Sequence, residues 1–224
     1  MKVIVFGGTG MIGQGVLREC LLDEGVTEVL AVGRTPTGRQ HPRLREIRHD
    51  DFADLTAIEA EFAGCDAVLF CLGVSSVGMT EAAYRRVTYD YTLAAARALA
   101  GHRPDAAFLY VSGAGTDSSA SGRSMWARVK GETENALIDL LPNAYLLRPG
   151  YIQPRHGATS KTRLYRVIYS VLGRPLYPVL RRLAPRWVTA TDELARVMLA
   201  VARHGAPKRV LETADIHEIG NLRN

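Results

Sequence analysis

Three glycines near the start of the chain have the spacing of a phosphate-binding turn. They follow an apolar run at residues 3–6 and precede a segment with helical character. A turn without Cβ atoms lets backbone N–H groups and the positive end of the next helix approach a pyrophosphate. We therefore expect a dinucleotide to bind here; the alternative is a purely structural turn. The residues of this glycine loop are Gly7, Thr9, Gly10, Met11, Ile12 and Gly13.

The end of the second apolar run indicates which dinucleotide is preferred. A protein that binds NAD usually carries an acidic residue there, which holds the ribose 2′-hydroxyl. This chain has Gly33 followed by Arg34. A guanidinium can form charge-assisted hydrogen bonds to a 2′-phosphate. The sequence thus favours NADP(H) over NAD(H), the alternative being that Arg34 only ends a strand in solvent.

Strands that alternate with helices must position these candidates. The expected strands are short, apolar and followed by Gly, Asp, Ser or Pro; they cover residues 2–6, 28–32, 44–48, 67–72, 107–112 and 144–148. The longest helices are expected at residues 80–100 and 124–141. A last helix with Thr191 as its N-cap precedes a short strand at 209–213. This alternation predicts an α/β fold with a doubly wound parallel sheet, the Rossmann fold.

The order of the remaining motifs resembles the short-chain dehydrogenase/reductase superfamily, in its extended and atypical branches, which are similar to NAD-dependent epimerases and dehydratases. The resemblance is carried by the glycine loop, then by Asp51 and Phe52, by Cys71, Leu72 and Gly73, by Ser112, by Lys130, and by Arg148, Pro149, Gly150, Tyr151 and Ile152. It implies an adenine contact for the first pair and a place in the cofactor cleft for the next three residues. The loop after Arg148 would pass the nicotinamide.

The resemblance also implies a catalytic group, and here the chain departs from the family. The family places a tyrosine four residues before its lysine, as the general acid and base, but this chain has Trp126. An indole N–H can donate a hydrogen bond but does not exchange a proton near neutral pH. The Asn that supports the family's proton relay is replaced by Thr88. A substitute acid could come from Tyr84, Tyr89, Tyr91, Tyr145, Tyr151, Tyr165, Tyr169 or Tyr177, which the sequence does not place.

Two other residues keep the types that the family uses. The resemblance implies that Lys130 binds the nicotinamide-ribose hydroxyls and that Ser112 donates to a substrate carbonyl. The alternatives are an exposed helix lysine paired with Glu134 and a serine that only caps a strand end. With Trp126, these form the candidate catalytic set.

Two functions remain open at this point. The first is an oxidoreductase that transfers hydride from NADPH to a small organic acceptor, assisted by Ser112 or solvent, because hydride chemistry belongs largely to the cofactor. The second is a non-catalytic NADP(H)-binding sensor or scaffold protein. This second hypothesis includes a protein that binds peripherally to a membrane surface. The missing tyrosine favours the second, and the retained serine and lysine favour the first.

Residues 151–190 differ from the rest of the chain in their proline content and charge. Prolines interrupt the alternation, and the wider stretch 140–191 has nine Lys or Arg and no Asp or Glu. We expect residues 1–224 to form one NAD(P)-binding domain, in which residues 151–190 are a basic, irregular insertion on the substrate side. The positive charge of this insertion suits an anionic small-molecule substrate. The alternatives are a membrane contact through residues 162–184 and a solvated surface. No nucleic-acid-binding pattern is present. The expected amphipathic helix presents Leu164, Val167, Ile168, Val171 and Leu172.

Composition sets the remaining bounds. With 224 residues, 47% of them hydrophobic and 23% charged, the chain can bury one core. Its apolar runs end short of the roughly 20 residues that a membrane span needs, and its start has no room for a signal peptide. Cys20, Cys65 and Cys71 form no disulfide or metal pattern, and the six histidines are scattered. We expect a cytoplasmic protein with reduced thiols and no metal ion.

Overall fold

The fold is built on seven parallel strands. The computed structural model describes residues 1–159, 177, 182 and 187–221. The strands are β1 (Lys2–Phe6), β2 (Glu28–Gly33), β3 (Leu44–Arg48), β4 (Ala67–Phe70), β5 (Ala107–Val111), β6 (Ala144–Arg148) and β9 (Val210–Glu212). They lie side by side in the order β3-β2-β1-β4-β5-β6-β9. This order confirms the predicted doubly wound parallel sheet.

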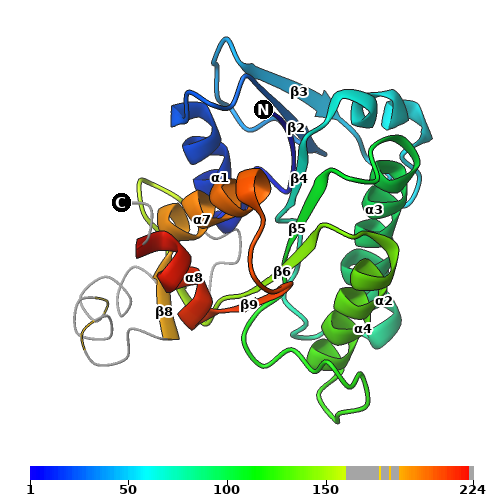
Figure 1. Cartoon of the computed structure of the whole chain (residues 1–224). Coiled ribbons are helices and arrows are strands. Elements are labelled where there is room, and N and C mark those ends of the chain that lie inside the picture. The colour runs from blue at the N-terminus through cyan, green and yellow to red at the C-terminus, as the bar shows by residue number, and fades with distance from the viewer. Residues whose placement is uncertain (160–176, 178–181, 183–186, 222–224) are drawn as a thin grey trace.

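Helices cover both faces of the sheet (Figure 1). One face carries α1 (Met11–Leu22), α7 (Thr191–His204) and α8 (Thr213–Asn221). The other carries a 3₁₀ segment (Thr56–Gly64), α2 (Glu81–Arg85), α3 (Tyr91–His102) and α4 (Met125–Leu140). A separate two-stranded sheet pairs β7 (Tyr151–Gln153) with β8 (Val188–Ala190).

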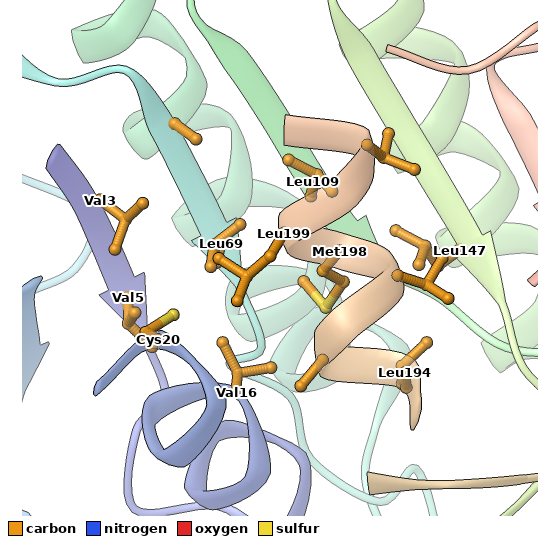
Figure 2. Packing of buried hydrophobic residues seen from close by; sticks show 14 of the residues in the cluster. Val3, Val5, Val16, Cys20, Leu69, Leu109, Leu147, Leu194, Met198 and Leu199 are labelled. Carbon is orange, nitrogen blue, oxygen red and sulfur yellow. The ribbon is translucent and has the colours of Figure 1, made fainter. Parts of the chain in front are cut away.

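Alternation along the strands divides the core into two layers. Val3 and Val5 of β1 face α1 and α7, whereas Ile4 and Phe6 face the opposite layer. Figure 2 shows the first layer, where Met198 of α7 points into the side chains of the sheet. Full burial of each large apolar side chain contributes about 1.5–3 kcal/mol, so these two layers hold the strand ends, and the loops that follow them, in place.

The structure corrects several expected boundaries. The helix expected at 80–100 is interrupted by a π-helical stretch, Arg86–Asp90. Ala190 occupies the N-cap position of α7, so the prediction of Thr191 there was wrong; Thr191 is the first helical residue, and its hydroxyl accepts a hydrogen bond from the N–H of Arg155. Strand β4 ends at Phe70, two residues before the expected end at residue 72, and the backbone of Cys71 and Leu72 then lies against Gly7. The expected helix at 164–172 lies outside the described residues.

The three thiols sit at different depths. Cys20 on α1 and Cys65 before β4 are buried, and Cys71 after β4 is half-buried. Desolvation raises the pKa of all three, to about 12 for Cys65 and Cys71. The thiols are therefore protonated and unreactive in the folded chain at neutral pH.

Candidate functional site

The glycine loop has the geometry of a pyrophosphate cradle. Gly7 has φ of +81°, and a Cβ there would lie 2.7 Å from the backbone of Cys71. A Cβ on Gly13 would lie 2.1 Å from the carbonyl oxygen of Gly7. These two glycines are required by close packing of the loop against α1 and β4. Gly10, the N-cap of α1, faces more open space, because its Cβ would meet only the Gly7 oxygen, at 3.3 Å. The loop thus leaves the helix N-terminus accessible, which fits an anionic ligand.

A cleft of about 470 Å³ adjoins this loop. Its lining comes from the glycine loop, from α1 and from the loop after β2: Thr9, Gln14, Thr35, Pro36, Thr37 and Arg39. Arg34, the residue predicted to select the cofactor, is exposed beside this lining and is not part of it. Sequence reasoning missed Arg39, although Gly38, with φ of +74°, marks the turn that precedes it. The cleft therefore joins the glycine loop to the loop that follows β2.

The predicted adenine pair divides between core and surface. Phe52 is buried, and its ring meets that of Phe6 edge-on with centroids 6.1 Å apart. Asp51 is exposed, and its carboxylate accepts a hydrogen bond of 3.1 Å from the N–H of Ala53. The ring of Phe52 therefore belongs to the core, and its backbone and the Asp51 carboxylate are the groups left for a ligand.

The residues after β4 lie against the glycine loop. The N–H of Cys71 donates to the carbonyl of Phe6 at 3.0 Å, which extends the strand pairing by one residue. Leu72 is half-buried, and its N–H would lie 2.7 Å from a Cβ on Gly7. A Cβ on Gly73 would have no atom within 4 Å. The three residues thus line the edge of the sheet where the resemblance implied a cofactor cleft.

Helix α4 brings Trp126 and Lys130 to the carboxyl end of β5. The Trp126 ring lies beside Gly115, whose Cβ would be 3.5 Å from it. Lys130 is half-buried, and its ammonium donates to the carbonyl oxygen of Ser112. Desolvation lowers the pKa of Lys130 to about 8, and the nearby charge of Glu134 opposes this shift.

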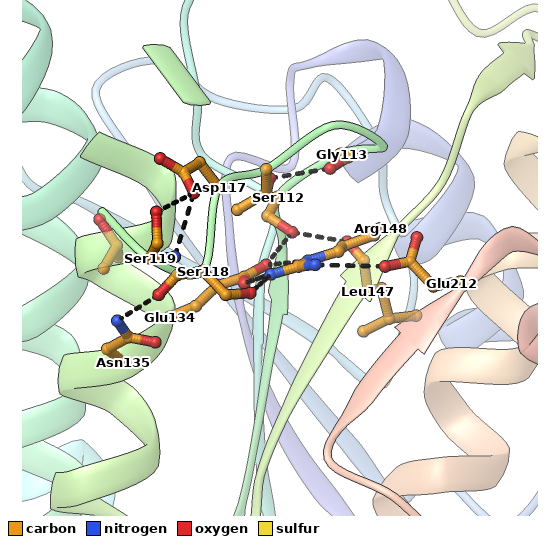
Figure 3. A network of polar contacts seen from close by, with 12 residues as sticks. Ser112, Gly113, Asp117, Ser118, Ser119, Glu134, Asn135, Leu147, Arg148 and Glu212 are labelled. Carbon is orange, nitrogen blue, oxygen red and sulfur yellow. Dashed lines mark hydrogen bonds and ion pairs between the residues drawn. The ribbon is translucent and has the colours of Figure 1, made fainter. Parts of the chain in front are cut away.

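Ser112 and Glu134 belong to a buried polar network (Figure 3). The Ser112 hydroxyl lies 2.5 Å from Glu134 Oε1 and 3.1 Å from the carbonyl of Leu147. The Glu134 carboxylate forms an ion pair with Arg148, whose Nε lies 3.1 Å from each of its oxygens. Arg148 also reaches Ser118 and Glu212. The alternative that Lys130 is an exposed helix lysine paired with Glu134 is therefore wrong, because Glu134 is buried and pairs with Arg148. The Ser112 hydroxyl points into the protein.

The loop after β6 closes the site from the other side. The carbonyl of Pro149 accepts from the N–H of Ala114 at 2.9 Å. A Cβ on Gly150 would lie 2.4 Å from the carbonyl oxygen of Trp187, so only glycine fits there. Ile152 is buried in β7, and the Tyr151 hydroxyl donates to Gln153. These contacts fix the loop across the ends of β5 and β6.

Gln14 connects this loop's continuation to the glycine loop. Its amide N–H group donates to the carbonyls of Thr9, at 3.0 Å, and Thr159, at 3.2 Å. The N–H of Thr159 donates back to Gln14 Oε1 at 3.3 Å. Residues far apart in sequence thus meet at the start of α1, and no local sequence pattern predicts this contact.

The positions of the tyrosines limit the choice of a substitute acid. Tyr84 and Tyr145 are buried, Tyr89 lies under the guanidinium of Arg85, Tyr91 packs against Phe52, Tyr151 binds Gln153 and Tyr177 lies beside Arg155. Burial raises the pKa of Tyr84, with a hydrogen bond from Thr88 opposing it. Tyr165 and Tyr169 lie outside the described residues.

Strand order, glycine loop and adjoining cleft together define a Rossmann-type dinucleotide-binding protein. Residues 3–124 match the NAD dependent epimerase/dehydratase family, and the chain belongs to this family. A protein of Aspergillus oryzae named "Protein fmp52-2, mitochondrial" is 26% identical over 225 residues, which cover 96% of this chain and 95% of that protein. The predicted resemblance is thereby confirmed.

Solved structures share the fold. A short chain dehydrogenase family protein from Francisella tularensis has a TM-score of 0.63 and 15% identity, with 91% of each chain covered. The enzyme WbmF from Bordetella bronchiseptica, in complex with NAD⁺, has a TM-score of 0.67 and 17% identity over 99% of this chain and 78% of its own. These likenesses support the Rossmann architecture.

In residues 1–159 and 187–221 no three His, Cys, Asp or Glu side chains gather as metal ligands would. In the same part of the chain no helix is long and apolar enough to span a membrane.

Proposed function

We propose that this chain is an NADP(H)-dependent oxidoreductase that transfers hydride to a small organic acceptor. The observation that carries the proposal is the cradle formed by Gly7 and Gly13, which leaves the N-terminus of α1 open. The half-buried Lys130 lies at the carboxyl end of β5, at the same edge of the parallel sheet. The cofactor would supply the hydride, and the protein would orient it and exclude water. The glycine loop would hold the pyrophosphate, and Lys130 would hold the nicotinamide ribose.

The preference for NADP(H) rests on cations at the cleft after β2. Arg34 is exposed at its rim and Arg39 lines it, and the six lining residues include no carboxylate. A 2′-phosphate would find two guanidinium groups within one loop, whereas a 2′-hydroxyl would find no acidic acceptor among the lining side chains. The cytoplasmic location predicted from the sequence stays a proposal, and the fungal relative is named as mitochondrial.

Replacing Arg34 with Ala is expected to weaken NADPH binding by about 1.5–3 kcal/mol, the range for hydrogen bonds to charged groups. NADH binding should change little. Isothermal calorimetry with both cofactors measures the difference, and Arg103→Ala, at the far end of α3, is the matched control. Equal affinity of the unmodified protein for NADPH and NADH would contradict the NADP(H) assignment.

Replacing Trp126 with Tyr is expected to create weak oxidation of secondary alcohols. The phenol would stand one helical turn before Lys130, where the family has its acid and base. At pH 7 the unmodified protein should show little of this activity, because the Lys130 amine is protonated below its pKa of about 8 and indole is not a base. Both proteins are assayed with NADP and a panel of alcohols and ketones, after circular dichroism has shown that the variant is folded.

The non-catalytic alternative is favoured by one observation, the indole at the position of the phenol. The discriminating experiment supplies NADPH and three probe acceptors, isatin, diacetyl and FMN, and follows NADPH oxidation. Consumption of NADPH with formation of reduced acceptor supports the oxidoreductase. Tight NADPH binding without turnover of any probe supports a sensor or scaffold.

A further inference from the structure

The structure leaves Lys130 as the titrating group best placed to exchange a proton at the end of β5. Trp126, one turn earlier on α4, does not titrate in the neutral range. The Ser112 hydroxyl is held between Glu134 and the carbonyl of Leu147. Tyr110, the nearest phenol, is buried under Lys130 with its ring centroid 6.0 Å from the ammonium nitrogen. Lys130, in contrast, is a half-buried residue whose ammonium donates to the carbonyl oxygen of Ser112.

The groups around Lys130 allow its charge to change. On its own helix the neighbouring carboxylate is Glu134, and this carboxylate forms its ion pair with Arg148 of β6. From β5 come the Ser112 carbonyl, which accepts one of the three ammonium protons, and the Tyr110 ring. Tyr84 of α2 lies behind Tyr110 and is buried. Burial disfavours the ammonium form, so that neither protonation state is locked by a direct carboxylate contact.

We propose that Lys130 Nζ donates the proton that the family takes from its tyrosine. The inference rests on the proposed oxidoreductase function. In reduction of a ketone, the hydride and its electron pair pass from NADPH to the carbonyl carbon, and the C=O π electrons move to oxygen. A proton then passes from Lys130 Nζ to that oxygen, which leaves an alcohol, NADP⁺ and a neutral amine. Solvent reprotonates the amine.

The pH dependence of this step has a definite sign. The ammonium form is the donor, and desolvation lowers its pKa to about 8. Reduction should therefore be constant below pH 8 and should fall tenfold per pH unit above it. The reverse oxidation, which needs the neutral amine, should rise through the same range.

The test uses Lys130→Arg, which keeps the positive charge and the hydrogen-bond donors for a ribose but does not titrate below pH 12. We expect NADPH affinity, measured by calorimetry, to stay within about threefold. Turnover of isatin and diacetyl should fall about 100-fold or more, in line with the loss of a general acid, and the pH profile should become flat. Lys208→Arg, on an exposed ion pair with Asp215, is the matched control and should behave as the unmodified protein.

A second readout does not depend on activity. The chain has four lysines, Lys2, Lys130, Lys161 and Lys208, so ¹³C-lysine labelling gives four ε-carbon signals, and the signal lost in Lys130→Arg identifies Lys130. That signal should titrate near pH 8.

Three outcomes overturn the inference. Turnover by Lys130→Arg within tenfold of the unmodified protein shows that another group donates the proton. Losses of NADPH affinity and turnover that match show a cofactor-binding role only. Binding of NADPH by the unmodified protein without reduction of either probe contradicts the proposed function itself, and the inference with it.

Discussion

Replacing Glu134 with Ala should lower the free energy of unfolding by about 3–5 kcal/mol, the cost of breaking a buried ion pair from one side. Glu134 has 1% of its side-chain surface exposed, and Arg148 has 10%. Without the carboxylate, the Arg148 guanidinium would stay buried with only Glu212 and Ser118 near it. Denaturant unfolding followed by circular dichroism measures the loss.

Glu212→Ala provides the matched comparison, because Glu212 contacts the same guanidinium from a half-exposed position. Exposed ion pairs contribute about 0–1 kcal/mol, so this variant should be nearly as stable as the unmodified protein. Equal losses for the two variants would show that the burial of Glu134 does not determine the stability of the network.

Two substitutions in the glycine loop should abolish cofactor binding for different reasons. Gly10 has φ of −78° and ψ of 164°, a backbone conformation that any residue adopts. Gly10→Val should therefore fold, while its side chain fills the space that a pyrophosphate needs. A Cβ on Gly13, 2.1 Å from the Gly7 oxygen, forces α1 away from the loop. Gly13→Ala should lose binding together with about 3 kcal/mol of stability.

Calorimetry with NADPH and NADH, paired with thermal unfolding, separates these effects. Gly101→Ala in α3 is the control, since a Cβ there meets no atom within 4 Å, and Ala is the better helix former. A folded Gly10→Val protein with unchanged affinity for both cofactors would remove the glycine loop from the site.

Strands and their order followed from local patterns in the sequence. Five of the six predicted runs, such as residues 2–6 and 144–148, are apolar because a parallel strand inside the sheet is buried on both faces. The sixth, residues 44–48, carries charged side chains and forms the half-exposed edge strand β3. The structure contains a strand at each of the six runs. Features set by contacts across the sequence could not be found this way. The pairing of β7 with β8 joins residues 151 and 188, and the 3-residue strands leave almost no periodicity to detect.

For the candidate site too, features set by local sequence could be predicted and features set by distant contacts could not. Gly7 and Gly13 could be recognised because glycine is the residue type that close backbone packing demands. The direction of the Ser112 hydroxyl could not, since its partner Glu134 lies 22 residues away and is itself turned inward by Arg148. A polar side chain at a strand end gives the same sequence signal whether it faces a ligand or the core.

Because the three thiols are buried to different depths, their rates of chemical labelling can measure the opening of different parts of the fold. Labelling reagents attack the thiolate, and burial keeps Cys20 and Cys65 in the protonated form inside the two core layers. Their modification therefore requires the core itself to open, with the free energy of that opening. Cys71, at the edge that we assign to the cofactor, needs only a local displacement of the loop after β4. One labelling time course should thus contain two rates: a slow rate at Cys20 and Cys65 for opening of the core, and a faster rate at Cys71 for displacement of the loop after β4.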